Sequence, residues 1–434
     1  MIPGRGFFLI LALWVLSALL VVVWPQIEFL WTGTGLALLA IAWIDLRACA
    51  GRGPPSVERR VAGSLPLGVW TEITLRFGTP DGNELKAAVF DHHPPGDDVL
   101  GLPASVTVPG SGWAELCYQY RPRTRGDRHF EAVELLVESP MRIWRKRVRG
   151  ANADVVRVYP NFAEVSKYAL LATGNRLSQM GIRKQARRGE GTEFHQLREY
   201  HAGDSMRQID WKATLRMRKI ISREYQEERD QQIMLLIDCG RRMTAHDGAL
   251  SHFDHSLNSA LMLAHVALRQ GDLVGLQTFG GTDRFLAPSR GRGTLRAFLN
   301  CVYDVQPSNH SPDYLQVARE TIARVRKRSL VIVMTNLRDE DVSEIIPAVQ
   351  LLRRRHLVLL ASLREPIVGD VLRNPVQRFR DALTVAAVHK YLLGRRRTLD
   401  TIRRYGVITL DVDADRLPIS MVNRYLDIKQ SGVL

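Results

Sequence analysis

The stretch from residue 189 to residue 229 holds the densest set of side chains that could do chemistry. Five charged residues stand close together there: Arg198, Glu199, Asp204, Arg207 and Asp210. A turn precedes Met206, so Asp204 or Ser205 is placed to cap a helix that begins near it. Arg207 and Asp210, three residues apart, would then share one helical face. We expect these charges to form a buried network that joins the segment to the next domain, or a polar groove that receives a partner.

A catalytic use of the same segment depends on His195 and Glu199, which are four residues apart. On a helix this spacing would bring an imidazole beside a carboxylate, a pair suited to proton transfer. No nucleophile or second base accompanies them, and the sequence has no G-x-x-x-x-G-K loop, G-x-S-x-G elbow or H-E-x-x-H motif. The residues therefore favour a binding segment over an active site.

Composition sets the broad class of the chain. Its 434 residues are 45% hydrophobic, which is enough for two or three domains with buried cores. The four cysteines lie too far apart to indicate a disulfide framework or a zinc finger, so the soluble part fits a reducing, cytosolic setting. Attraction to anionic lipid accounts for the net charge of +15. Few aromatic residues interleave the arginine clusters, so no nucleic-acid partner is expected.

The first 50 residues form a predicted transmembrane helical hairpin, with apolar runs at residues 7–24 and 29–44. Each run is long enough to cross most of a bilayer, and the second run argues against a cleaved signal peptide. The connector carries no Lys or Arg, whereas cations flank the outer ends of the hairpin. They are Arg5, Arg47, Arg52, Arg59 and Arg60. This asymmetry predicts a two-pass protein of the plasma membrane whose N-terminus and soluble domains are cytoplasmic.

Residues 55–160 have the pattern of an all-β, sandwich-like domain. Short strand-like runs are expected at residues 70–77, 87–90, 105–108, 116–120 and 130–137, separated by Gly, Pro and Asp turns. The signature segment, residues 161–231, follows this domain.

Residues 232–434 alternate buried strand-like runs with amphipathic helices, the pattern of an α/β doubly wound parallel sheet. Strands are expected at residues 233–237, 273–279, 330–334, 357–363 and 407–412. A helix over residues 251–270, ended by Gly271, should cover one face of the sheet.

The signature segment resembles the bacterial membrane proteins grouped as domain-of-unknown-function family fifty-eight. The residues that carry the resemblance are Gly191, Glu193, Phe194, Leu197, Arg198, Tyr200, Gly203, Asp204, Arg207, Ile209, Asp210 and Trp211. A D-x-G-x-x-M element at residues 238–243 and an NRYLDIK ending at residues 423–429 extend the resemblance over nearly the whole chain. It implies that residues such as Glu193, Phe194, Tyr200, Gly203 and Trp211 mark a partner-binding segment.

The resemblance also implies that the α/β domain is von Willebrand factor A-like. Such domains hold a divalent ion at the carboxyl edge of the sheet, on an Asp-x-Ser-x-Ser loop, a Thr and a later Asp. The corresponding positions here are Asp238, Gly240, Arg242, Thr294 and Asn336. Magnesium prefers carboxylates and other oxygens, so this degenerate set predicts no bound metal and no cofactor. An arginine at position 241 or 242 would instead serve as the counter-ion of Asp238.

Together these features predict a membrane-anchored, non-enzymatic scaffold or adaptor. The lipid bilayer is the first expected partner. The resemblance implies a second, a MoxR-type AAA+ ATPase, together with other membrane proteins, in protein complex assembly. The alternative is a hydrolase or transferase that acts at the inner leaflet through the polar cluster from Arg198 to Asp210.

Overall fold

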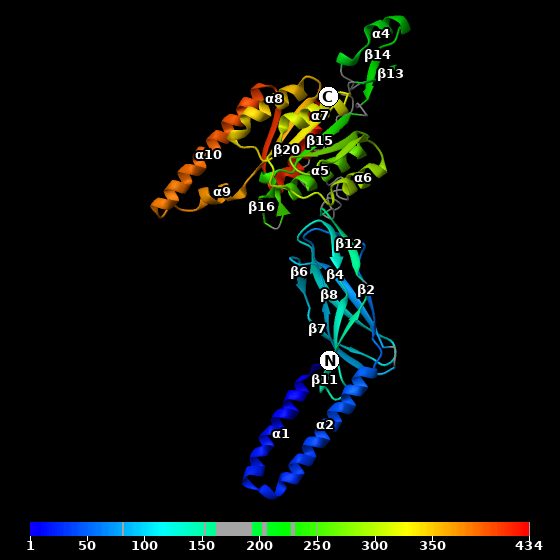
Figure 1. Ribbon diagram of the computed structural model, residues 1–434. Helices are drawn as coiled ribbons and strands as arrows, with labels where there is room; N and C mark the ends of the chain where they lie inside the picture. The colour runs from blue at the N-terminus through cyan, green and yellow to red at the C-terminus, as the bar shows by residue number, and fades with distance from the viewer. Residues whose placement is uncertain are drawn as a thin grey trace. The chain divides into compact units, whose positions relative to one another are not determined.

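The computed structural model describes the chain except for residues 80, 81, 152, 162–192, 202–205, 227–230, 249 and 434 (Figure 1). It divides into two compact units, residues 1–159 and 160–434. The first contains two apolar helices and a β-rich region, and the second contains a mixed α/β sheet.

Two helices near the N-terminus, where the hairpin was predicted, are long and apolar enough to cross a membrane. They are α1 (Arg5–Val23) and α2 (Glu28–Gly51), joined by the short helix η1 (Pro25–Ile27). The second helix continues seven residues past the predicted end at residue 44, because its polar last turns are held by the β-rich region. The buried carboxylate of Asp45 accepts hydrogen bonds from Ser139 Oγ at 2.5 Å and from the Met141 N–H at 3.0 Å.

The β-rich region is sandwich-like, as predicted. One sheet has the order β1-β11-β10-β5-β7, a second has β2-β4-β8-β6, and a third has β3-β12-β9. All pairings are antiparallel except β3 with β12. The strands are β1 (Ile2–Pro3), β2 (Ser56–Arg60), β3 (Ser64–Pro66), β4 (Thr71–Gly78), β5 (Leu85–Asp91), β6 (Asp98–Leu100), β7 (Ala104–Val108), β8 (Trp113–Arg121), β9 (Gly126–Phe130), β10 (Val133–Glu138), β11 (Trp144–Gly150) and β12 (Asp154–Tyr159).

This region differs from the sequence expectation in two ways. The run at residues 130–137 is two strands, β9 and β10, rather than one. Arg59, expected as a juxtamembrane cation, lies instead in the core of the sandwich. Its guanidinium contacts the buried carboxylate of Asp91 at 2.6 Å, and both side chains are fully buried. Tyr118 donates a further hydrogen bond to Asp91 at 2.7 Å.

The second unit is built on a six-stranded sheet of order β19-β18-β15-β20-β21-β22. Five strands are parallel, as predicted, and the edge strand β19 is antiparallel. β19 escaped prediction because its residues FLAPS are half-exposed and include a proline. The strands are β15 (Gln232–Asp238), β18 (Leu273–Phe279), β19 (Phe285–Ser289), β20 (Leu330–Thr335), β21 (Leu357–Arg364) and β22 (Ile408–Asp413).

Helices cover both faces of this sheet. One face packs against α5 (His252–Arg269), α6 (Arg292–Val302) and α11 (Leu417–Gln430). The other packs against α7 (Tyr314–Arg324), α8 (Val342–Arg353) and the second half of α10 (Phe379–Arg404). The predicted helix over residues 251–270 is α5, which Ser251 and Asp254 begin with a reciprocal capping box. These layers confirm a C-terminal α/β domain.

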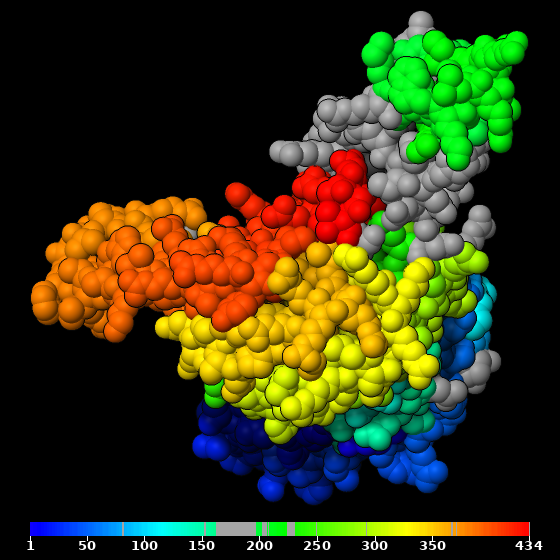
Figure 2. Space-filling model, turned by 90° about the horizontal axis from the view of Figure 1, so that it is seen from above, coloured from blue at the N-terminus to red at the C-terminus, as the bar shows by residue number. Residues whose placement is uncertain are grey.

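The first half of α10 and the short helix α9 (Pro366–Arg373) form an arm that extends from the body of this unit, coloured orange in Figure 2. Apolar side chains on the arm are exposed, among them Phe379 and Leu383. Farther along α10, by contrast, Arg395 and Leu399 are buried.

Candidate functional site

The signature segment folds into a small module. Strands β13 (Glu193–Glu199) and β14 (Ile221–Gln226) pair in antiparallel fashion, and between them lie the short helix η3 (Met206–Gln208) and helix α4 (Trp211–Met217). Gly203 and Asp204 fall outside the described residues, as do the side chains of Glu193, Phe194 and Arg207.

Asp210 organises the described part of this module. One carboxylate oxygen accepts hydrogen bonds from the N–H groups of Lys212 and Ala213, both at 3.0 Å, which caps α4. The other oxygen accepts from Arg223 Nε at 2.9 Å. The hydrogen bond from Ala213 and that from Arg223 hold the pKa of Asp210 below its ordinary value. A single carboxylate therefore fixes both the start of α4 and its position on β14.

The prediction that a helix begins near Met206 is wrong. Residues Met206–Gln208 form only one tight turn, and α4 begins at Trp211 with Asp210 as its cap. The proposed pairing of His195 with Glu199 also fails, because both lie on the strand β13 rather than on a helix. Residues four apart on a strand are separated by about 13 Å.

The polar residues of the segment form separate contacts rather than one cluster. Arg198 Nη1 donates to the Glu199 carbonyl at 3.2 Å and lies 3.0 Å from His201 Nδ1. Lys219 donates to the Glu199 carboxylate at 2.7 Å, and this contact lowers the pKa of Glu199. Arg198 on β13 pairs with Ser222 on β14. Its side chain therefore projects from the face of this two-stranded sheet opposite to that of Arg223, which contacts Asp210. The Tyr200 N–H donates to the Ile220 carbonyl at 2.9 Å.

An apolar surface lies on the module around Trp211, which the family resemblance marks as part of a partner-binding segment; the sequence reasoning did not include Leu215. Trp211 and Leu215 are one helical turn apart on α4, and they are 66% and 81% exposed. We call Trp211 and Leu215 the signature face. Three further apolar residues near them in the chain are exposed as well: Met206, Met217 and Ile220. The signal that could have found this surface was the apolar spacing of residues 211 and 215 within a charged stretch.

At the carboxyl edge of the α/β sheet, Asp238 lies where the degenerate metal site was expected. It is 1% exposed, and both of its oxygens are bonded within the protein. Oδ1 accepts from the Gly240 N–H at 2.7 Å, and Oδ2 accepts from Thr335 Oγ1 at 2.6 Å. Burial raises the pKa of Asp238 to about 6, although these two hydrogen bonds oppose the rise. The structure thus brings Gly240 to Asp238.

The remaining positions of the expected site lie in other contacts. Arg242 pairs with Asp341 and, at 3.0 Å, with Glu340 rather than directly with Asp238, although its charge lowers the pKa of Asp238. Thr294 lies on α6, with its hydroxyl 3.2 Å from Ser289 Oγ. Within the described ranges, no group of three or more His, Cys, Asp or Glu residues is arranged to hold a metal ion.

Asn336 belongs to a second network at this edge. Its Nδ2 lies 3.3 Å from Glu365 Oε1 and 3.4 Å from Nδ1 of the buried His252. Its Oδ1 lies 3.5 Å from Arg395 Nη1. Arg338 joins the same network through an ion pair with Glu365 at 3.0 Å.

Arg395, from α10, is the residue that sequence reasoning missed entirely, since it stands in a run of arginines interpreted as a solvated helix face. It is 2% exposed and lies among the ends of three strands. Its guanidinium donates to Asp411 Oδ1 at 2.8 Å, to the Leu337 carbonyl at 2.5 Å and to the Leu363 carbonyl at 2.6 Å. The buried guanidinium of Arg395 therefore links these segments at the carboxyl edge of the sheet.

The chain was compared with curated proteins, solved structures and sequence families. No curated protein matches the chain at a significant level. Among solved structures, the CARDB domain of a Pyrococcus furiosus protein is 13% identical, with a TM-score of 0.18; the match covers 24% of this chain and 94% of that domain. A FixG-related protein from Vibrio parahaemolyticus is 9% identical, with a TM-score of 0.17; the match covers 24% of this chain and 97% of that one.

A match at the level of sequence families covers the signature module and much of the α/β sheet. The matched segment begins within β13 and ends just past α9. These residues, 196–374, match the model of the family described as "Protein of unknown function DUF58".

Proposed function

We propose that the protein is a membrane-anchored, non-enzymatic scaffold that binds a protein partner through the signature face. In this proposal the hairpin anchors the chain in the bacterial inner membrane, with its N-terminus and both soluble regions in the cytoplasm. Its α/β domain is von Willebrand factor A-like with a degenerate metal site. The partner implied by the family resemblance is a MoxR-type AAA+ ATPase, which acts with this scaffold in protein complex assembly.

The exposure of Trp211 and Leu215 is the observation that carries this proposal. Exposed apolar patches with a polar surround are typical of interaction surfaces, and tryptophan is among the residues that contribute most to binding. Lys212 and Arg216 are also exposed on α4, and they supply a charged rim. Asp210 and Arg223 hold the helix in place, so little order has to be gained on binding.

The carboxyl edge of the sheet supports a structural role for the α/β domain. Asp238 and Arg395 are the charged groups best placed for chemistry there, and each is buried and bonded to protein groups. A substrate would have to displace these bonds before it reached either side chain. We therefore assign the domain the task of presenting a stable surface.

The proposal is tested with the full chain in detergent and the MoxR-type ATPase purified from the same organism, in ATP and ADP. We expect Trp211→Ala combined with Leu215→Ser to weaken binding roughly tenfold or more, as for a hot-spot pair. The matched control, Phe379→Ala with Leu383→Ser, removes equally exposed apolar side chains from the arm and should leave binding unchanged. Equal binding by the signature-face variant and the unaltered chain would contradict the proposal.

A further inference from the structure

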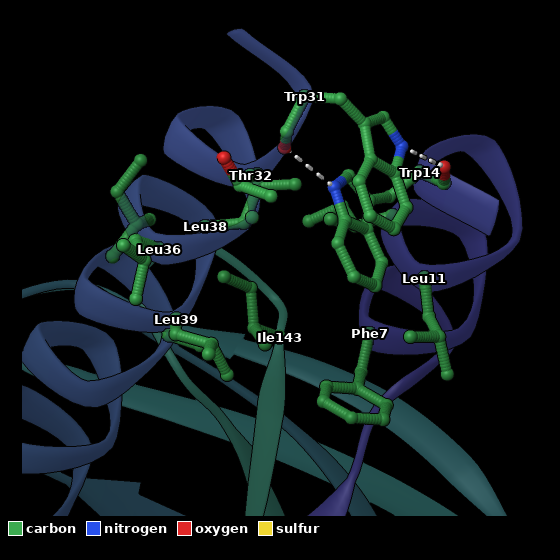
Figure 3. Close-up of a pocket in the computed structure, with 13 residues that line it drawn as sticks. Phe7, Leu11, Trp14, Trp31, Thr32, Leu36, Leu38, Leu39 and Ile143 are labelled. Atoms are coloured by element: carbon green, nitrogen blue, oxygen red, sulfur yellow. Dashed lines mark hydrogen bonds between the residues drawn. The ribbon is translucent and has the colours of Figure 1, made fainter. Parts of the chain in front are cut away.

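An apolar groove of about 340 Å³ lies between helices α1 and α2. Its walls are the side chains drawn in Figure 3, which come from both helices and from Ile143. The Thr32 hydroxyl is the one hydrogen-bonding group of a non-aromatic side chain in this wall, and it donates to the Phe29 carbonyl of its own helix at 3.0 Å. The groove therefore offers a ligand only apolar contact.

Aromatic side chains lie at both ends of the groove. At one end the rings of Trp14 and Trp31 stack with centroids 4.4 Å apart and planes inclined by 7°. Gly35 makes room for this stack, since a Cβ at that position would lie 2.7 Å from the Trp14 ring. At the other end lie Phe7 and Ile143 (Figure 3). Phe7 also contacts Trp144, with ring centroids 5.4 Å apart.

The length of the groove matches one leaflet of a bilayer. From Phe7 to Trp14 the helix rises about 10 Å, and from Trp31 to Ala42 it rises about 16 Å. Half of a typical hydrocarbon core is about 15 Å, whereas a transmembrane helix of a partner needs about 30 Å. A helix could not pass the tryptophan stack, but an acyl chain from one leaflet can end there.

Two exposed cations, Arg5 and Arg142, lie at the end of the groove near Ile143. Arg142 directly precedes Ile143, and Arg5 follows Gly4, whose N–H donates to the Ile143 carbonyl at 2.7 Å. Nearby carboxylates do not balance them: Glu138 contacts Arg145 at 2.9 Å and Arg142 at 4.0 Å, and Asp45 is buried. Arg142 also has a φ of 58°, which is uncommon for a residue with a side chain. This end of the groove is therefore suited to an anionic group.

We propose that this groove binds one anionic phospholipid of the adjoining leaflet. One acyl chain lies between α1 and α2 and ends at the Trp14–Trp31 stack, and the phosphate lies beside Arg5 and Arg142. The inference rests on the membrane anchoring in the proposed function. It adds a lipid-binding site that fixes the hairpin relative to strand β11.

The test is native mass spectrometry of the full chain released from nanodiscs that contain equal amounts of phosphatidylcholine and phosphatidylglycerol. We expect one phosphatidylglycerol to remain bound in preference to phosphatidylcholine. Leu11→Trp, which fills the groove, should abolish retention of that lipid. Arg5→Gln with Arg142→Gln should lower the preference for phosphatidylglycerol by roughly thirtyfold, since each juxtamembrane cation contributes about a fivefold effect.

Matched controls separate these effects from general damage. Leu13→Trp adds the same ring to an exposed position of α1 outside the groove, and Arg60→Gln with Arg157→Gln removes two exposed cations elsewhere in this unit. Both controls should retain the lipid. If Leu11→Trp loses helix content by circular dichroism, Leu39→Trp fills the groove from α2 instead.

Equal retention of the two lipids would overturn the inference, as would equal effects of Leu11→Trp and Leu13→Trp. A lipid-free dimer that Leu11→Trp dissociates would show that a second copy fills the groove, and would also overturn it. Alkaline carbonate washing of membranes distinguishes the two proposals. Release of the chain contradicts the anchoring, whereas a retained chain without bound lipid contradicts only the lipid site.

Discussion

The carboxyl edge of the α/β sheet and the signature module carry the same kinds of charged side chain in opposite environments. Arg395 is 2% exposed and contacts β21, β22 and the segment that follows β20. In the module, Glu199 and Lys219 pair at 2.7 Å with more than half of each side chain exposed. A buried charge is costly to leave unpaired, whereas an exposed pair contributes little. The buried charges at the carboxyl edge thus stabilise the α/β domain, whereas the exposed charges of the module remain accessible to a partner.

The largest effect is expected from Arg395→Ala. Removing the guanidinium leaves Asp411 and two strand-end carbonyls without a buried partner, which should destabilise the α/β domain by about 3–5 kcal/mol. The measurement is urea-dependent hydrogen exchange of the β20 amides in the full chain. Arg396→Ala, at the exposed neighbouring position, should change stability by less than about 0.5 kcal/mol. Equal effects of the two variants would remove the contrast drawn above.

Asp238→Asn should change how the stability of the same domain depends on pH. Burial raises the pKa of Asp238 to about 6 in the folded state, so between about pH 4 and 6 the folded chain holds a proton that the unfolded chain has released. The stability contribution of this group is therefore present at low pH and falls by about 3 kcal/mol as the pH rises through that window.

Asparagine does not titrate, yet it keeps an oxygen for the Gly240 N–H and can donate to Thr335. Hydrogen exchange of β20 at pH 4 and pH 7 gives the difference in unfolding free energy between Asp238→Asn and the unaltered chain. That difference should shift in favour of the variant at pH 7. A difference independent of pH would show that the Asp238 carboxyl has the same pKa in both states.

Asp210→Ala should loosen the signature module locally without affecting the sheet. The cap of α4 and the contact to Arg223 are both lost, so the Lys212 and Ala213 amides should exchange roughly five- to tenfold faster. Hydrogen exchange resolved to single residues measures this, with the β20 amides as an internal control. Faster exchange of the β20 amides as well would indicate that the module is part of the α/β core.

Glu199→Gln should have the smallest effect. The ion pair with Lys219 is exposed, so its loss should leave the unfolding midpoint unchanged at physiological salt. The melting curve followed by circular dichroism is sufficient to check this. A clear fall in the midpoint would mean that exposed charges of the module also stabilise the fold.

The sequence predicted the strands that are buried on both faces more reliably than the exposed ones. Runs such as LLI in β15 and LVIVM in β20 are apolar throughout, which leaves few alternatives to a central strand. Strand β11, WRKRVRG, lacks an apolar alternation and was not predicted. It forms because β10 on one side and β1 on the other supply its hydrogen bonds, and the pairing with β1 connects residues distant in the chain.

The candidate sites were predicted in position but not in contacts. The end of the first buried strand located Asp238, yet no local pattern shows that Arg242 turns to Asp341 or that Arg395 reaches Asp411. Both contacts join segments far apart in sequence, and the arginine runs that supply them are typical of exposed helices. In the signature segment, Asp210 was recognised as important, but its role as a cap depended on where α4 begins.

The pairing of β1 with β11 has a consequence for how the protein is made. Ile2 lies opposite Arg145, so the first strand must wait until the ribosome has synthesised its neighbour. At 5–20 residues per second, this delay is roughly 7–30 s. Both apolar helices leave the exit tunnel during that interval. In the membrane-anchored protein proposed above, insertion of these helices would therefore precede closure of the β-sheet.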